Sequence, residues 1–196
     1  LVLAHRVGIS TFVTGGMGGV HRGVAESWDV SADIQQLAQT RMVLVSAGIK
    51  SILDIPKTLE VMETFSIPTM TWQSSEFPAF FSPHSGCDSP LTVETAEQVA
   101  NIYQMQHNLK LPQGMLVAVP NPNPAAGEQV EMAIQHALNQ AQDYGITGAR
   151  VTPFVLQHVA ESTQGASLQS NIELIQNNAK VGAEIAKAIA FAKKSR

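Results

Sequence analysis

The sequence predicts an α/β fold, a three-layer α/β/α arrangement around a largely parallel or mixed central sheet. Short, continuous apolar runs recur along the chain, and amphipathic helical patterns alternate with them. Continuous apolar runs are typical of parallel strands that are buried on both faces. Strands that alternate with helices favour a sheet covered by helices on both sides. Such sheets bind ligands at the carboxyl ends of their strands, where two of the apolar runs end in glycine-containing turns.

The apolar runs define the predicted strands. They lie at residues 11–14, 42–47, 67–72 and 115–119. The first run is followed by a glycine cluster and the second by Gly48. We therefore expect these two turns to lie close together at one edge of the sheet.

Capping residues mark the helices in the first half of the chain. A helix is predicted at residues 31–39, between the first two strands. Asp54 and Pro56 suit the N-cap and first turn of a helix that reaches residue 65. Thr95 and Gln98 have the spacing of a capping box, which predicts a helix as far as residue 108.

The second half of the chain is predicted to be mostly helical. Residues 128–144 carry one apolar stripe, and Gly145 ends that helix. Pro153 suits the first turn of a short helix. Ser170, with Glu173 three positions later, is predicted to cap a long last helix.

Composition narrows the class of protein. With 196 residues and 44% hydrophobic residues, the chain predicts a single α/β domain over residues 1–196. The net charge of −4 offers no basic face, so we expect no nucleic-acid polymer as a partner. No apolar run approaches the length of a membrane span, so we expect no membrane association. The single cysteine, Cys87, fits a reducing compartment.

The first candidate for chemistry is the segment 14–23, TGGMGGVHRG. Glycines allow backbone N–H groups to approach a phosphate closely, and His21 and Arg22 add donors and charge. The spacing matches neither the dinucleotide fingerprint nor the Walker loop. A tight turn with a surface histidine and arginine is an equally good interpretation.

The second candidate is the pair Asp29 and Asp33, which flank Ser31 at a predicted helix start. Hard oxygen ligands of this kind suit Mn²⁺ or Mg²⁺ with several waters retained. The pattern alone favours a simpler interpretation, in which Ser31 caps the helix and the carboxylates favour its N-terminus.

The third candidate is Lys50, just past a buried strand and within an apolar run. A lysine removed from water is a usable amine nucleophile. The commoner fate of such a lysine is to extend its ammonium group to solvent, and the pattern alone favours that interpretation.

Several polar and aromatic residues form a fourth, weaker group. Residues 76–81 read as an apolar turn that walls a pocket or packs in the core, and residues 121–124 as a rigid loop. Asn171 and Asn178 lie on the last predicted helix, and an asparagine amide can recognise the edge of a base. Capping or packing remains the default for these residues.

Taken together, the segments follow the order found in one enzyme family. They are TFVTGGMGGVHRGV, WDVSADIQQLAQT, VLVSAGIKSILDIPKTLE, EFPAFF, NPNP and SLQSNIELIQNNA. On these motifs the chain resembles the pseudouridine-5′-phosphate glycosidases over nearly its whole length. The resemblance implies cleavage of the carbon–carbon bond between uracil and ribose 5-phosphate.

The resemblance also implies roles for individual residues. Lys50 would be the nucleophile that forms an imine with ribose C1′, and Asp29 would bind Mn²⁺ or another divalent cation. The remaining residues would bind substrate: Ser31, Ala32, Asp33, Thr14, His21 and Asn171. Thr14 and His21 are expected at the phosphate and Asn171 at the uracil.

The resemblance further implies a cytoplasmic homo-oligomer, a trimer, with small-molecule partners: pseudouridine 5′-phosphate, ribose 5-phosphate and uracil. It places a general acid/base glutamate and a substrate-binding lysine before the glycine loop, and this sequence does not match them. We therefore expect a piece of a longer domain, or else a truncated homologue. The alternatives are a ribose-phosphate-binding module without activity and another imine-forming sugar-phosphate lyase.

Overall fold

The computed structural model describes residues 1–123, 127–147, 150–162 and 166–194. Its centre is a five-stranded sheet in the order β1-β3-β7-β5-β6, in which every neighbouring pair is parallel. The strands are β1 (Thr11–Val13), β3 (Val43–Ser46), β5 (Thr69–Trp72), β6 (Thr92–Val93) and β7 (Met115–Ala118). The predicted α/β class with a largely parallel sheet is confirmed.

The sheet is buried on both faces. All residues of β3 and β7 are buried, and alternate positions belong to different hydrophobic clusters. Leu44 and Leu116 face one cluster, whereas Val45 and Val117 face the other. Because successive side chains of a strand point to opposite faces, both layers of helix need apolar partners, and this explains the continuous apolar runs.

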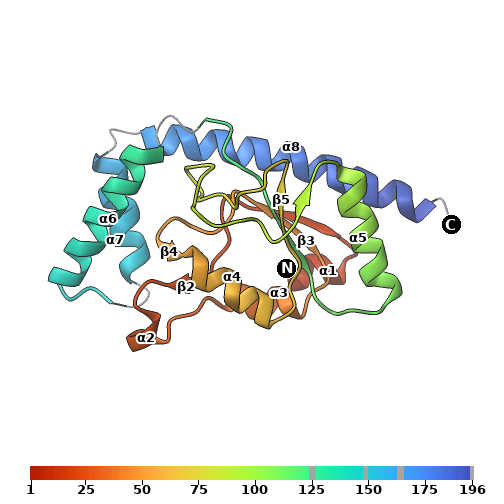
Figure 1. The fold of residues 1–196 in the computed structure, drawn as a ribbon, viewed down its shortest axis with the longest axis horizontal. Coiled ribbons are helices and arrows are strands. Elements are labelled where there is room, and N and C mark those ends of the chain that lie inside the picture. The colour runs from red at the N-terminus through yellow and green to blue at the C-terminus, as the bar shows by residue number, and fades with distance from the viewer. Residues whose placement is uncertain (124–126, 148–149, 163–165, 195–196) are drawn as a thin grey trace.

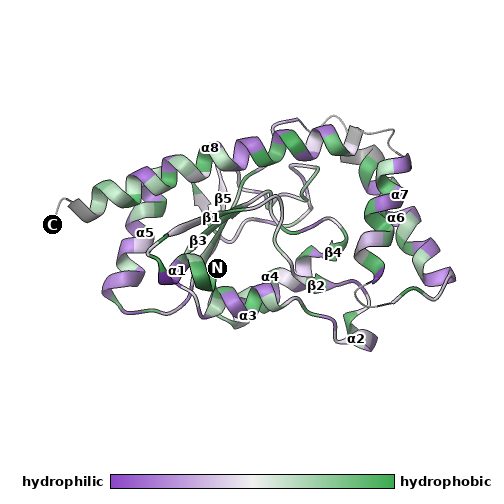
Figure 2. Ribbon diagram, turned by 180° about the vertical axis from the view of Figure 1, so that it is seen from behind, coloured by the Kyte–Doolittle hydropathy of each residue, from purple (hydrophilic) through white to green (hydrophobic). Residues whose placement is uncertain are grey.

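Helices form the two outer layers. The first layer contains α3 (Ala32–Ala38) and α4 (Ile55–Thr64), and the second α5 (Ala96–Asn108) and α8 (Ala166–Lys194). Figure 1 shows α8 along most of the length of the molecule, with α6 (Gly127–Asp143) and α7 (Val151–Ser162) side by side near its beginning. Figure 2 shows that the central strands are mostly hydrophobic, whereas α6 and α8 alternate hydrophobic with hydrophilic residues.

Several predicted boundaries are confirmed by their caps. Asp54 is the N-cap of α4, and Thr95 and Gln98 form a complete capping box at α5. Gly145 follows α6 with φ 63°, a left-handed conformation that favours glycine. Pro153 lies in the first turn of α7. Of the predicted loop 121–124, residue 124 lies outside the described residues.

The prediction for Ser170 is wrong. Helix α8 begins at Ala166, so Ser170 lies inside it and is only 4% exposed. Its hydroxyl instead accepts a hydrogen bond of 2.9 Å from the Asn121 side-chain amide. The serine and glutamate spacing resembled a capping box, but a tertiary hydrogen bond explains this serine.

Four short elements were not predicted: one helix, α2, and three two-residue strands, of which β6 belongs to the central sheet. Helix α2 (Val24–Ser27) forms about one turn, as does α1 (Val2–Arg6) at the start of the chain. Strands β2 (Val20–His21) and β4 (Leu53–Asp54) form a separate antiparallel pair. Two-residue strands contain too few positions to show a period, so only the contact between distant segments defines them.

Candidate active site

The candidate site lies at the carboxyl edge of the parallel sheet. The glycine loop follows β1, the Lys50 segment follows β3, and the turn at residues 77–82 comes after β5. Because the strands are parallel, these three segments emerge at the same edge. This edge is where sheets of this class bind ligands.

The glycine loop and the Lys50 segment run side by side beyond their strands. Thr14 N donates to Val45 O at 3.0 Å, and Ala47 N donates to Gly15 O at 2.8 Å. Further along, Met17 N donates to Gly48 O and Lys50 N donates to Met17 O, both at 3.0 Å. The parallel ladder is thus prolonged as far as Lys50, which fixes the lysine backbone against the loop.

The loop glycines are required for space and not for their backbone angles. None of Gly15, Gly16, Gly18 and Gly19 has a left-handed φ. A Cβ on Gly16 would lie 2.5 Å from the Phe80 ring and 3.2 Å from Lys50 Cγ. Any side chain at position 16 would therefore collide with the wall beside the lysine.

Gly18 brings the loop onto the start of α3. Its Cβ would lie 2.2 Å from Ser31 Oγ and 2.7 Å from Asp33 Oδ2. Gly18 N donates to Asp33 Oδ2 at 2.9 Å, and Ser31 N donates to Gly19 O at 2.9 Å. Ser31 also caps α3, because its hydroxyl accepts from Asp33 N at 3.3 Å. The predicted N-cap at Ser31 is thus present. Ala32 is the first residue of the helix, and it is exposed.

Asp29 and His21 lie together at one end of the loop. His21 N donates to Asp29 O at 3.0 Å, and His21 Nδ1 is 3.8 Å from Asp29 Oδ2. The Asp29 side chain is 37% exposed. In the described part of the chain, no three His, Cys, Asp or Glu side chains gather into a metal site. A cation such as Mn²⁺ fits Asp29 only with waters or substrate oxygens as its other ligands, an arrangement that magnesium-like ions favour.

Lys50 is exposed, although the eight residues before it are all buried. Its stem lies against Gly16, as the contact of Cγ shows. The structure therefore places the amine at the surface of the site, in the geometry that extends an ammonium group toward solvent.

Helix α8 adds two amides to the site. Asn171 Oδ1 lies 3.5 Å from the Cβ position of Gly15, and it is buried without a hydrogen-bond partner among the described residues. Asn178 is 1% exposed, and its amide donates to Thr14 O at 2.9 Å and Gly15 O at 3.3 Å. From the sequence alone, packing is the expected role of Asn178. Because Asn178 lies two turns after Asn171, both amides are on one face of the helix. This spacing is the feature of the sequence that could have identified Asn178 as a site residue.

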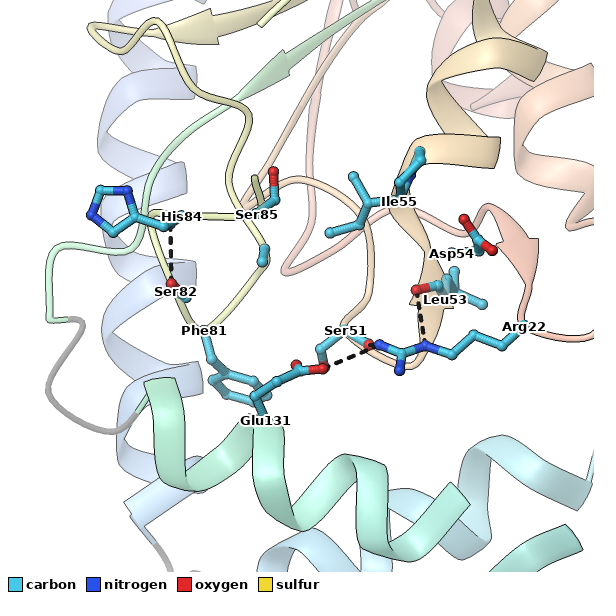
Figure 3. Close-up of a pocket in the computed structure, with 12 residues that line it drawn as sticks. Arg22, Ser51, Leu53, Asp54, Ile55, Phe81, Ser82, His84, Ser85 and Glu131 are labelled. Atoms are coloured by element: carbon cyan, nitrogen blue, oxygen red, sulfur yellow. Dashed lines mark hydrogen bonds and ion pairs between the residues drawn. The ribbon is translucent and has the colours of Figure 1, made fainter. Parts of the chain in front are cut away.

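A cavity of about 550 Å³ opens beside these residues (Figure 3). Ser51, next to Lys50, lies on its wall, whereas the predicted site residues surround the glycine loop instead. Arg22 crosses the cavity from the β2–β4 pair: it donates to Ser51 O at 3.0 Å and to Gln135 Oε1 at 2.8 Å. It also contacts Glu131 Oε1 at 3.2 Å. Arg22 therefore connects the β2–β4 pair to α6, a role that the sequence did not indicate.

Two carboxylates near the cavity are held in the charged form. Burial raises the pKa of Asp54, but hydrogen bonds and charge from Lys57, with a contribution from Arg22, lower that pKa below its ordinary value. A hydrogen bond from His84 lowers the pKa of Glu76, assisted by the backbone N–H groups of Gly86 and Ser85. Glu76 accepts from these groups at 2.7, 2.8 and 2.9 Å, so it stabilises the loop over residues 84–86.

The chain is similar to known proteins in both sequence and fold. Residues 1–188 match the family model described as Indigoidine synthase A like protein. The pseudouridine-5′-phosphate glycosidase of Caldanaerobacter subterraneus is 45% identical over 188 residues, which are 95% of this chain and 61% of the relative. The protein of that name from Arabidopsis thaliana is 46% identical over 191 residues, 96% of this chain and 58% of the relative.

A solved structure is similar over the whole chain. The prealnumycin C-glycosynthase AlnA, in complex with ribulose 5-phosphate, superposes with a TM-score of 0.93 at 30% identity. The match covers 100% of this chain and 65% of that protein. The chain thus spans about three fifths of the length of the curated relatives that it matches.

Proposed function

The chain belongs to the Indigoidine synthase A like protein family, and on this premise we propose that it carries the lysine-bearing part of a pseudouridine-5′-phosphate glycosidase. The reaction splits pseudouridine 5′-phosphate with water into uracil and ribose 5-phosphate, reversibly. The observation that carries the proposal is the position of Lys50. It follows β3 at the carboxyl edge of the sheet, and its stem contacts the glycine loop. The names of the curated relatives support the same activity.

A lysine suits this bond because the base is attached through carbon. Ordinary glycosidases use two carboxylates and a leaving group that departs on a heteroatom. Here uracil C5 must take up a proton and leave with the electrons of the C1′–C5 bond. The Lys50 nitrogen bonds to C1′, the C1′–O4′ bond breaks, and O4′ takes up a proton, which opens the ribose ring. That nitrogen then supplies the electrons that form an imine as the C1′–C5 bond breaks. Water then hydrolyses the imine, which releases ribose 5-phosphate and restores the amine.

The other residues around the loop are assigned to binding. Thr14 and His21 are proposed to hold the phosphate, with Ser31, Ala32 and Asp33 near the sugar. Asn171 is proposed to face the uracil, since its buried Oδ1 has no partner among the described residues. An unpaired buried acceptor is costly, and a ligand N–H group would satisfy it.

Asp29 is proposed to hold a divalent cation, Mn²⁺ or a similar ion, because its partly exposed carboxylate leaves room for waters. When bound, such an ion would neutralise negative charge on the sugar phosphate. Asp33 differs, because its carboxylate already accepts from Gly18 N. Asp33 therefore orients the glycine loop through this hydrogen bond.

The proposal includes the cellular location and the oligomeric state of the enzyme. We assign it to the cytoplasm as a homotrimer. None of the helices in the described ranges combines the length and hydropathy that a membrane span needs. The low charged fraction of 14% supports association with further copies.

Trapping the imine tests the proposal. Ribose 5-phosphate and Mn²⁺ are added with sodium borohydride, and the intact mass is measured. A reduced adduct adds the mass of ribose 5-phosphate less one oxygen atom. We expect peptide mapping to place it on Lys50 and Lys50→Ala to abolish it. Lys110→Ala is the matched control, because Lys110 is also exposed but precedes β7 at the opposite edge of the sheet.

Each outcome of the trapping experiment is decisive. An adduct that persists in Lys50→Ala would show that another amine reacts. No adduct on the unaltered protein would overturn the imine mechanism. If ribose 5-phosphate nevertheless raises the melting temperature, the protein is a sugar-phosphate-binding module.

A further inference from the structure

Phe80 has a backbone conformation that a phenylalanine rarely adopts. Its φ is 61°, in the left-handed region. Among the described residues, Trp28, Ser66 and Lys110 share this feature, but each lies at the C-terminal end of a helix, where it is common. Gln73, with φ 54°, directly follows strand β5. Phe80 belongs to neither kind of position, so another cause is needed for its strain.

The turn that contains Phe80 normally takes a glycine at this position. Ala79 N donates to Ser82 O at 2.8 Å, and Ser82 N donates to Ala79 O at 3.4 Å, so Phe80 and Phe81 are the two central residues. A tight turn with positive φ at its first central residue favours glycine there. A bulky side chain at a strained position is a reason to look for a function.

The Phe80 ring lies directly on the candidate site. It approaches the Cβ position of Gly16 to 2.5 Å, while Lys50 Cγ approaches the same point to 3.2 Å. The ring and the lysine stem therefore pack on one glycine. Phe81 supports the ring from behind in an edge-to-face contact, with centroids 4.6 Å apart, and is itself 8% exposed.

The surroundings of the turn hold it in place. Ala79 forms an antiparallel bridge with Gly48, and the Cβ position of Gly48 is 2.6 Å from Pro78 O. The Asn121 amide donates to Phe81 O at 3.3 Å. The turn is thus attached to the segment that carries Lys50, only two residues before the lysine. These contacts can maintain a strained φ that an isolated turn would not keep.

We propose that Phe80 is a positioning residue for Lys50: its ring confines the lysine stem against Gly16 and keeps water from that side. The inference rests on the proposed imine role of Lys50. A free lysine side chain has many rotamers, and an enzyme gains rate when the attacking amine is already oriented before the sugar arrives. The lysine is exposed, and the Phe80 ring is the side chain nearest to the Cβ position of Gly16 that the lysine stem also approaches.

Substitutions at Phe80 separate the ring from the strain. Phe80→Gly removes both, Phe80→Leu keeps apolar bulk with the strain, and Phe80→Tyr keeps the ring. The readout is the rate of borohydride trapping at a series of ribose 5-phosphate concentrations. In Phe80→Gly we expect the maximal rate to fall about tenfold. The half-saturating concentration should change less than about twofold, because the proposed phosphate contacts lie elsewhere.

Conservative variants and a strain control complete the test. Phe80→Tyr should trap at the unaltered rate, and Phe80→Leu should be intermediate. Lys110→Gly relieves a left-handed residue of similar φ, 59°, away from the site, so it should leave the rate unchanged. This control separates the loss of the ring from a general effect of relaxing the backbone.

The inference fails if Phe80→Gly traps as fast as the unaltered protein. Should Phe80→Gly not fold, Phe80→Leu decides, because a rate equal to that of Phe80→Tyr would show that no ring is needed. An equal loss in the maximal rate and in affinity would indicate a disturbed site instead of a positioned lysine. Failure of the proposed function looks different, because the unaltered protein would then form no adduct.

Discussion

The glycines after β1 differ in how closely their surroundings approach them. At Gly18 an added Cβ would lie 2.2 Å from Ser31 Oγ, inside any possible contact distance. At Gly15 the nearest atom, Ile175 Cγ1, is 3.4 Å away, an ordinary contact. Both residues belong to one loop and neither has a left-handed φ. Substituting alanine at each position therefore compares crowding alone.

Gly18→Ala should lower the free energy of unfolding by about 2 kcal/mol, within the usual cost of overpacking. The new methyl group must displace Ser31 and Asp33, and with them the hydrogen bond from Gly18 N. Gly15→Ala should stay within about 0.5 kcal/mol. Urea unfolding of both variants measures the difference. Equal stabilities would show that Gly18 does not lie in close contact with the start of α3.

Two helix starts illustrate how far a local pattern can be trusted at the scale of an element. Thr95 is exposed, and its hydroxyl accepts from Gln98 N at 3.3 Å, so it is a true N-cap. Ser170 has the same spacing to an acidic partner, but it is buried inside α8 and binds Asn121. The same sequence signal thus has two different structural causes.

Substitution by aspartate should change the stability of the protein differently at Thr95 and at Ser170. Thr95→Asp should keep the stability of α5 within about 0.5 kcal/mol, since aspartate is a good N-cap. Ser170→Asp should cost about 3 kcal/mol or more, because it buries a charge without a cationic partner. Thermal or urea unfolding of the two variants provides the comparison. A stable Ser170→Asp protein would mean that α8 begins at Ser170 after all.

At the scale of the molecule, the parallel sheet brings the functional loops together and α8 closes them from one side. Helix α8 contacts β1 and β3 and supplies Asn171 and Asn178 to the glycine loop. Helices α7 and α8 also expose large apolar side chains, among them Leu156 at 57%, Leu168 at 61% and Ile172 at 42%. Exposed apolar groups of this kind are frequent where copies associate.

We expect light scattering of the protein in solution to give a mass three times that of its chain. The reason is the burial of apolar surface that a lone chain leaves in contact with water. Measurement over a range of micromolar concentrations separates a stable trimer from weak association. A monomer mass throughout that range would contradict the proposed trimer.

Much of the fold was accessible from local patterns. Each of the four predicted strands overlaps an observed strand, and the caps at Asp54 and Thr95 are confirmed. Burial on both faces of a parallel sheet leaves continuous apolar runs, and a cap occupies a few adjacent residues. The strands β2, β4 and β6 were not predicted, because a strand of two residues is too short to show an alternating pattern.

The candidate site shows the same difference between features that depend on neighbouring residues and features that depend on distant segments. Local patterns were enough to identify the residue types at the carboxyl edge: the glycines, the two carboxylates near Ser31, and Lys50 after a buried strand. The approach of Phe80 to Gly16 and the hydrogen bond from Asn178 to the loop are evident only from the folded chain. Periodicity and capping depend on neighbours along the chain, whereas the space around Gly16 depends on segments that meet only when the sheet forms.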